Sequence, residues 1–207
     1  MKHSILLLCL LSLAAFGCAD PTTDKPKAEV EAPAPTPKPA AGGVKLALAE
    51  GSTIGFVGSK VTGSHEGGFN SFTGDVTLVD NDPTNSSISL MIDTTSIWTD
   101  AERLTGHLKS EDFFDVAKFS QASFNSTEIR REAEGYTMVG NLDLHGVTKS
   151  ISFPASIEIA DGMVKATAEF AIKRFDFGIE YKGKADDLIR DEVVINLDLR
   201  AARKGAA

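Results

Sequence analysis

The sequence predicts an all-β domain of about eight or nine antiparallel strands, closed as an up-and-down barrel or folded over as a sandwich. Apolar and polar residues alternate from Val44 onward, which is the pattern of strands with one buried face. Short turn sequences separate the alternating stretches, and short turns join antiparallel neighbours. Because the pattern lacks the regular helical crossovers that parallel strands need, an antiparallel sheet follows.

Apolar residues two or four positions apart mark the individual strands. In chain order they are Phe72, Val76 and Leu78; Ile88, Leu90 and Ile92; Ala122 and Phe124; Tyr136, Met138, Leu142 and Leu144; Ile151 and Phe153; Ile157 and Ile159; Val164, Ala166, Ala168, Phe170 and Ile172; and Val193, Ile195, Leu197 and Leu199. Turn residues separate these strands at positions 80–83, 134–135, 145–146 and 161–162. Small residues such as Gly140 opposite large ones such as Phe124 either leave a channel or interdigitate into a solid core, and the periodicity leaves both open.

One segment, residues 98–119, breaks the alternation and is predicted to form two short helical pieces. Thr99 followed three positions later by Glu102 has the form of a capping box, and Ser110 is placed to cap a second turn. The segment carries an apolar face of Leu104, Leu108, Phe113, Phe114, Val116 and Phe119. We expect this face to cover part of the barrel with one of the two adjacent phenylalanines inward, because neighbouring helical residues point about 100° apart.

The N-terminus has the form of a bacterial signal peptide at residues 1–17. A basic start precedes a short apolar run, and small residues precede Cys18 in an arrangement that resembles a lipobox. Cys18 is therefore expected to be acylated and to begin the mature chain; simple secretion with cleavage nearby is the alternative. Ala19 rather than Asp follows the cysteine, which predicts a lipid-anchored protein of the cell envelope that faces the periplasm, at the outer membrane. Because Cys9 is lost with the signal peptide, the folded domain is expected to have no disulfide.

Residues 18–43 are predicted to be the lipidated cysteine and a linker. The linker is rich in Pro, Ala, Lys and Glu, with Val30 as its only large apolar residue. Such a composition cannot make a core and favours an extended, semi-rigid spacer. The folded domain is therefore expected at residues 44–207.

Composition and charge restrict the partners of this 207-residue chain. The formal net charge is -8, and no Lys/Arg cluster stands out. A patch able to neutralise many phosphates is not expected, so no nucleic acid partner is predicted. A hydrophobic fraction of 42% suits a globular domain rather than a membrane protein with many spans.

Several ordered motifs resemble the YceI-like, polyisoprenoid-binding family. They are SHEGGF at 64–69, LTGHLKSEDFFDVAKF at 104–119, ASFNS at 122–126, GNLDLHGVTK at 140–149 and RFDFG at 174–178, and the resemblance spans about residues 46–200. It implies a lipocalin-like antiparallel β-barrel of about eight strands, with one or two short helices covering part of the barrel. It also implies an elongated apolar cavity, which in some members holds a long isoprenoid chain. Thr105 and Gly106 stand where the family usually has an Arg-Asp pair, so a role of that Asp is not carried over.

A barrel that binds a lipid needs an apolar lining and, where a head group is held, a few polar residues at the mouth. The candidate ligand-binding residues are His65, Arg103, His107, Phe113, Phe114, Phe124, Phe170 and Arg174. Structural alternatives compete with the polar candidates. Arg103 is also explained by a surface ion pair, for example with Asp100, and His107 by helix packing with a bond to a backbone carbonyl. His145 is explained by its place in a turn.

Three classes of function remain open. The first is a binding module that carries an isoprenoid-like amphiphile of the polyprenyl or quinone kind; the second is an enzyme acting on such a lipid; the third is a structural or partner-binding protein with a filled barrel. No metal site is expected, because His65, His107 and His145 are far apart and form no ligand pair. The chain has no Gly-x-Ser-x-Gly elbow, so we expect no catalytic residue and no resident cofactor. The oligomeric state is not predicted.

Overall fold

The computed structural model describes residues 20–35 and 42–203. The signal peptide and Cys18 lie outside these residues and stay predictions. The strands are β1 (Glu29–Glu31), β2 (Val44–Leu48), β3 (Thr53–Lys60), β4 (Gly63–Phe69), β5 (Phe72–Val79), β6 (Asp82–Asp93), β7 (Ile97–Thr99), β8 (Gln121–Arg131), β9 (Tyr136–Leu144), β10 (Val147–Ala160), β11 (Met163–Lys173), β12 (Gly183–Lys184), β13 (Asp187–Leu188) and β14 (Glu192–Ala202). The helical elements are α1 (Glu102–Leu108) and the short 3-10 helices η1 (Thr94–Ser96) and η2 (Arg174–Phe177).

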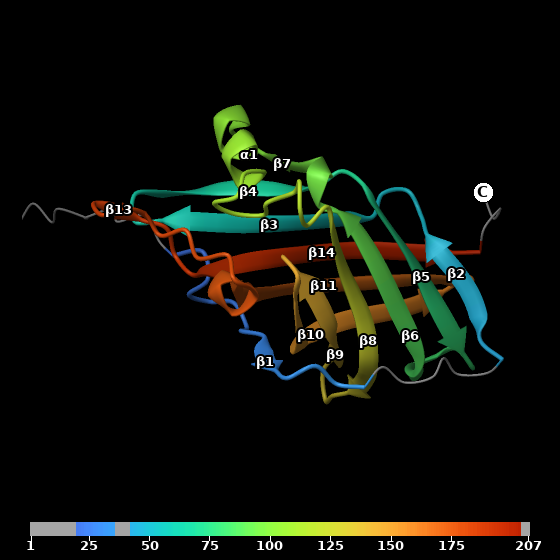
Figure 1. The fold of residues 1–207 in the computed structure, drawn as a ribbon. Coiled ribbons are helices and arrows are strands. Elements are labelled where there is room, and N and C mark those ends of the chain that lie inside the picture. The colour runs from blue at the N-terminus through green and yellow to red at the C-terminus, as the bar shows by residue number, and fades with distance from the viewer. Residues whose placement is uncertain (1–19, 36–41, 204–207) are drawn as a thin grey trace, which may run out of the picture.

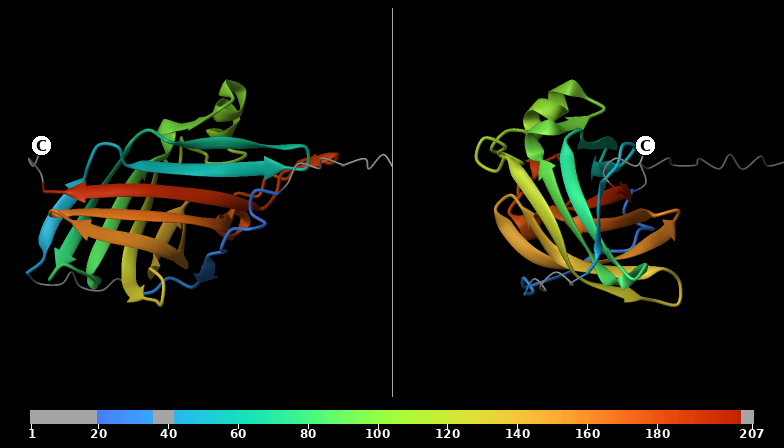
Figure 2. Two further views of the ribbon diagram at one scale, coloured as in Figure 1. Left: turned by 180° about the vertical axis from the view of Figure 1, so that it is seen from behind. Right: turned by 90° about the vertical axis from the view of Figure 1, so that its right-hand side faces the viewer.

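Eight strands close an antiparallel barrel, in the order β2, β5, β6, β8, β9, β10, β11 and β14, with β14 returning to β2 (Figure 1). The predicted lipocalin-like barrel is therefore confirmed, and the sandwich is excluded. β3 continues β2 along the same edge of β14, because Leu48 pairs with Ala201 and Thr53 with Asp198. β4 and β7 extend the wall beyond β3, and Figure 2 shows the resulting elongated barrel from two further sides.

The predicted alternation accounts for the core, because the apolar residues of each strand face the barrel interior. This core includes Leu46, Val76, Leu90, Phe124, Met138, Ile151, Phe153, Phe170 and Leu199. The tight turns follow the predicted turn residues. His145 and Gly146 have φ of 53° and 74° between β9 and β10, and Asp161 and Gly162 have φ of 51° and 75° between β10 and β11. Two successive residues of positive φ are what a two-residue hairpin turn needs, so the chemistry of these positions fixes the strand register.

The segment 98–119 forms one helix, α1, and not the two predicted pieces. The capping box is wrong: the N-cap is Ala101, and the Thr99 hydroxyl instead donates to the Ala101 carbonyl over 2.8 Å. Ser110 does not begin a second helix, because its hydroxyl donates back to the His107 carbonyl over 2.8 Å at the end of α1. Turns follow, and Asp115, with φ of 42°, departs from helical geometry. Phe113 is buried and its neighbour is half-buried, as expected for one inward side chain.

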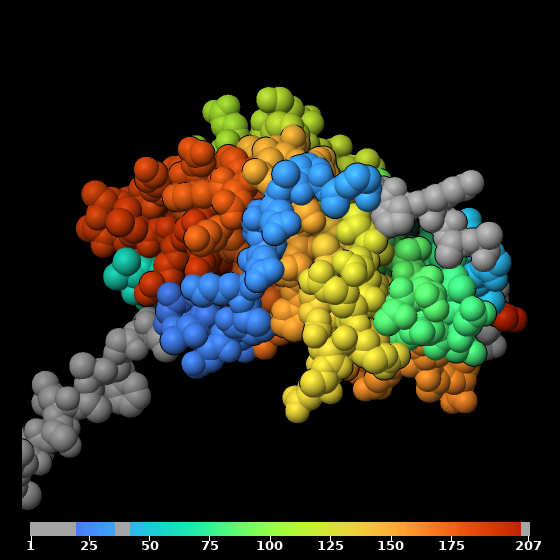
Figure 3. Space-filling model, turned by 90° about the horizontal axis from the view of Figure 1, so that it is seen from below, coloured from blue at the N-terminus to red at the C-terminus, as the bar shows by residue number. Residues whose placement is uncertain are grey.

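Residues 20–35, which we call the strap, lie against the barrel and are not an extended spacer (Figure 3). β1 pairs with β10 from Glu29↔Ser152 to Glu31↔Ser150. The Ala28 amide donates to the Ala171 carbonyl over 2.9 Å, and the Ala171 amide to the Pro26 carbonyl over 2.8 Å. These are backbone bonds, which a composition poor in apolar residues does not prevent.

The strap fills a seam in the barrel wall. β10 and β11 pair only from Ser156↔Thr167 to Ala160↔Met163, and the strap lies between them beyond that stretch. Its side chains add polar contacts: Lys25 pairs with Glu169 over 2.7 Å and Lys27 with Glu192 over 2.6 Å. Val30 and Ala28 pack against the main core. Part of the predicted linker therefore belongs to the folded unit.

Candidate functional site

The barrel encloses a cavity of about 410 Å³. Its lining is mostly aliphatic and aromatic, and it includes Ile54, Phe56, Phe69, Leu90, Leu108, Phe113, Phe114, Phe124, Leu142, Ile151, Phe153, Phe170, Ile172, Ile189, Ile195 and Leu199. This volume falls in the range of natural small-molecule sites, roughly 300–1,000 Å³. Of the two interiors that the periodicity allows, the structure has the hollow one.

Some of the small inward-facing residues leave open space in the cavity. Beside others, a neighbouring side chain occupies that space. Ala122, Ala166 and Ala168 line the cavity. At Gly140, by contrast, an added Cβ would lie 2.4 Å from the Phe124 ring, so that ring already occupies the space a side chain would need. The barrel is therefore hollow, but some of its small residues are packed against large side chains.

An aromatic layer drawn from three strands forms part of the lining. The rings of Phe153 and Phe170 stack with centroids 4.0 Å apart, and Phe124 packs on Phe153 at 5.8 Å. These rings belong to β8, β10 and β11, whose inward positions the alternation predicts. Phe124 and Phe170 are therefore lining residues, as expected for an apolar ligand site.

α1 and the turns after it close one side of the cavity. A second apolar cluster forms there from Ile97, Leu108, Phe113 and Ile179, with Phe56, Phe69, Leu104, Phe114, Leu144, Tyr181 and Ile189 packed against it. Phe113 lies 5.2 Å from Tyr181, and Phe114 lies 5.9 Å from Phe69 in an edge-on contact. Both adjacent phenylalanines line the cavity, although only Phe113 is fully buried.

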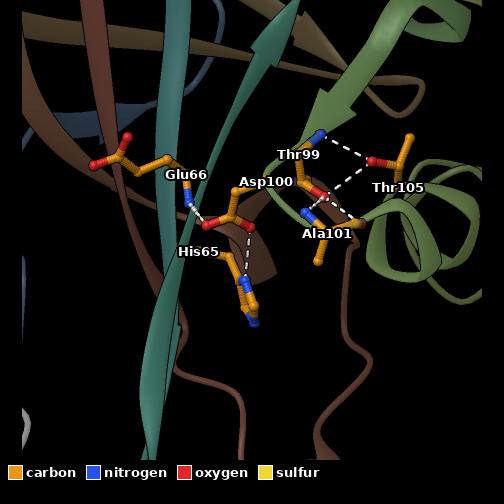
Figure 4. Close-up of polar contacts among 6 residues, drawn as sticks. All are labelled: His65, Glu66, Thr99, Asp100, Ala101 and Thr105. Atoms are coloured by element: carbon orange, nitrogen blue, oxygen red, sulfur yellow. Dashed lines mark hydrogen bonds and ion pairs between the residues drawn. The ribbon is translucent and has the colours of Figure 1, made fainter.

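His65 lies on β4 at the edge of the cavity and is oriented by Asp100 (Figure 4). The distance from His65 Nδ1 to Asp100 Oδ1 is 2.7 Å, and the Glu66 amide donates to Asp100 Oδ2 over 3.2 Å. The hydrogen bond with His65 lowers the pKa of the Asp100 carboxyl, so this group stays ionised at neutral pH. Asp100 thereby fixes the imidazole, whose other nitrogen stays available for a polar group of a ligand.

Arg174 also lines the cavity, but backbone carbonyls hold its guanidinium. It donates to the carbonyls of Ile179 over 2.6 Å, Arg190 over 3.0 Å and Ile189 over 3.3 Å. Only 5% of Arg174 is exposed, and this burial lowers the pKa of the guanidinium. Three of its five N–H donors are bound to the chain after η2, so Arg174 acts mainly to hold that end of the barrel together.

The two remaining polar candidates do not line the cavity. The His107 ring packs edge-on against Phe113 and Tyr181, each at 5.0 Å, and its Nε2 lies 2.7 Å from Asp112 Oδ2. This is the predicted packing role, with a carboxylate in place of a carbonyl. Arg103 is exposed on α1, and none of the ion pairs within 20–35 and 42–203 includes it. Asp100, the partner expected for Arg103, is bound to the histidine of β4 instead.

Sequence reasoning missed two basic residues on the cavity, Lys60 and Arg190. Lys60 lies at the end of β3 in the same alternating series as Ile54, Phe56 and Gly58. This alternation is the sequence signal that places its side chain on the cavity side of the strand. Lys60 forms an ion pair with Asp187. Arg190 precedes β14, in a stretch without periodicity, so no pattern identified it.

No group of three or more His, Cys, Asp and Glu side chains is arranged to hold a metal ion within the described part of the chain. The His145 ring packs on Phe119 with centroids 4.5 Å apart, and the residue makes the turn predicted for it. None of the helices in residues 20–35 and 42–203 has the length and hydrophobicity to cross a bilayer.

A comparison with protein families matches residues 47–201 to the YceI-like domain. The UPF0312 protein YE1254 of Yersinia enterocolitica is 42% identical over 91 residues, which are 44% of this chain and 47% of that protein. The UPF0312 protein YPTB2234 of Yersinia pseudotuberculosis is 38% identical over the same shares. The chain thus spans about half the length of the curated relatives it matches.

Solved structures share the fold. BcnA of Burkholderia cenocepacia matches with a TM-score of 0.64 and 22% identity, over 73% of this chain and 96% of that one. A polyisoprenoid binding domain from Saccharophagus degradans matches with a TM-score of 0.62 and 20% identity, over 78% of this chain and 99% of that one. With the family model matched along nearly the whole barrel, the chain belongs to the YceI-like domain family.

Proposed function

We propose that this protein is a lipid-anchored envelope protein that binds an isoprenoid-like amphiphile, of the polyprenyl or quinone kind, inside its barrel. The observation that carries the proposal is the cavity of about 410 Å³ with its apolar lining. Each buried CH₂ group contributes about 0.8 kcal/mol, so a chain of a few prenyl units gains affinity without hydrogen bonds. The polyisoprenoid binding of the Saccharophagus degradans domain, which shares the fold, agrees with such a ligand.

The rim of the cavity suits a small polar head. His65 is held by Asp100 at this edge, and Lys60 adds a cation close by. Because His65 Nδ1 donates to the Asp100 carboxylate, the other nitrogen of that imidazole tautomer is an acceptor, whereas the Lys60 ammonium is a donor. A hydroxyl group, which both donates and accepts, is the head group they would receive. The proposed role is binding and carriage, without a chemical step.

Solvent extraction and mass spectrometry of protein purified gently from a bacterial envelope test the ligand. We expect a long apolar molecule in stoichiometric amount. Ala166 lines the cavity on β11, so Ala166→Phe fills the space and should abolish uptake of added polyprenyl ligand. The adjacent Lys165 is exposed, and Lys165→Phe should bind as the parent does. Folded protein that never carries or takes up lipid would favour a structural role instead.

Membrane anchoring has its own test. Acylated Cys18 should carry the protein into a detergent phase, because two or more acyl chains anchor a protein stably. Cys18→Ser should move it to the aqueous phase. Unchanged membrane partitioning of this variant would contradict the anchor.

A further inference from the structure

The start of the strap is fixed to one end of the barrel. Asp20 pairs with Arg190 over 2.9 Å, and the Thr22 hydroxyl contacts Asp20 over 2.8 Å and Glu192 over 3.0 Å. Thr22 is only 1% exposed, so the strap is held here by packing as well as by charge. Arg190 and Glu192 stand at the beginning of β14, which places residue 20 at that end.

This attachment limits how far the barrel can lie from an anchor. The argument rests on the proposed acylation of Cys18. Two residues of chain reach about 7 Å at most from Asp20, whereas a free spacer of the predicted length would reach roughly tenfold farther. An anchored Cys18 therefore holds this end of the barrel at the bilayer surface.

The same end carries two exposed apolar side chains. Val61, at the tip between β3 and β4, is 56% exposed, and Leu188, in the β12–β13 hairpin, is 49% exposed. The two tips lie side by side, because the Val61 amide donates to the Leu188 carbonyl over 3.2 Å, and they project from one end of the barrel (Figure 1). Lys182 and Lys184 are exposed beside them, with Asp186 on the same hairpin. Apolar tips flanked by lysines suit the headgroup region of a membrane.

The cavity reaches this end as well. Lys60 directly precedes Val61, Ile189 directly follows Leu188, and both residues line the cavity. The lining of the cavity therefore comes within one residue of each exposed apolar tip.

We propose that the end of the barrel formed by the 61–62 tip and the 182–190 hairpin rests in the headgroup region of the membrane that holds Cys18, and takes its apolar ligand directly from that membrane. The strap sets the orientation, and the two apolar tips make the contact. Two such side chains bind a bilayer weakly by themselves, so their role is to orient a protein that is already anchored.

Tryptophan quenching by brominated lipids tests this orientation. The chain beginning at Cys18 is coupled through its thiol to a maleimide phospholipid in vesicles of phosphatidylcholine with brominated acyl chains. Trp98, the only tryptophan, is first replaced by Phe. Leu188→Trp then reports on the proposed contact. Met163→Trp is the control, because Met163 is 54% exposed beside Val164, whose partner Ala201 is near the far end of β14.

We expect quenching of the tryptophan at position 188 to be severalfold stronger than at position 163. Equal quenching, or stronger quenching at position 163, would overturn the orientation. Both substituted side chains are exposed, Leu188 at the end of β13 and Met163 at the start of β11, and an unchanged circular dichroism spectrum verifies the fold. Chemical coupling anchors the protein whether or not a cell acylates Cys18, so the result is independent of the Cys18→Ser experiment. Lipid uptake by the coupled protein is measured separately and tests the proposed ligand.

Discussion

Replacement of Arg174 by Met separates a structural role of this residue from a ligand-binding one. The side chain is 5% exposed and donates to three backbone carbonyls, those of Ile179, Ile189 and Arg190. Met has similar length and apolar stem but no donor. The substitution therefore leaves three carbonyl oxygens without their partner at the end of the barrel.

The magnitude follows from these contacts. A hydrogen bond to a charged group contributes about 1.5–3 kcal/mol, so three of them amount to roughly 4.5–9 kcal/mol. Burial opposes the charge, as the lowered pKa of Arg174 indicates, and Met removes that penalty. We expect a net loss of about 3–5 kcal/mol in the free energy of unfolding. Arg174→Lys keeps the charge but not the planar fork, and should lose about half as much.

Urea denaturation followed by circular dichroism measures these losses. We expect a lower midpoint at unchanged slope for both variants, with Met below Lys. Stability within about 0.5 kcal/mol of the parent for both would refute the reasoning. Unchanged stability together with lost lipid uptake would instead assign Arg174 to the ligand head group.

Three further predictions follow from the packing and the charges. Phe113→Ala should lower the free energy of unfolding by about 3–5 kcal/mol and Phe114→Ala by clearly less, because only the first is fully buried; denaturant titration checks the order. Gly140→Ala should cost about 1–3 kcal/mol, because its Cβ would lie 2.4 Å from an aromatic ring, whereas Gly58→Ala, with no atom within 4 Å, should be neutral in the same assay. A hydrogen bond from Lys27 of the strap lowers the pKa of Glu192. The stabilisation that this pair gives the folded protein is therefore complete above the ordinary carboxyl pKa of about 4, and it is lost as the pH falls through the lowered value. The protection factors of the strap amides, which correct for the intrinsic pH dependence of exchange, should therefore fall on acidification, and Glu192→Gln should flatten this dependence; identical protection profiles for the two proteins would count against the coupling.

The barrel could be predicted from the sequence because its information is local. Alternation along residues 193–199 and the paired turn residues at 145–146 specify strands and register without knowledge of the partners. The aromatic lining at Phe124 and Phe170 follows from the same alternation. The two-residue alternation and the turn residues are therefore enough to predict the fold and the apolar lining of the cavity.

The positions of the polar residues of the site depend on contacts between residues far apart in the sequence, and the alternation of apolar residues does not reveal these contacts. His65 and Asp100 are 35 positions apart, and the carbonyls around Arg174 belong to a stretch without alternation. Both the second helical piece and the capping box failed because Thr99 and Ser110 use their hydroxyls on carbonyls rather than on helix amides. The strap was missed because it docks through backbone bonds and ion pairs with residues far along the chain, and the composition of the segment does not reveal these partners.

The position of β14 has a consequence for how the chain folds. This last strand pairs with β11 on one edge and with both β2 and β3, from the start of the domain, on the other. The barrel of a growing or translocating chain therefore cannot close until residues 192–202 have emerged. Until then, the edge of β11 and the edge of β2 and β3 stay unpaired. Contacts of such long sequence separation make closure slow, and exposed edges invite pairing between chains. Protection from aggregation is needed for as long as β14 is absent.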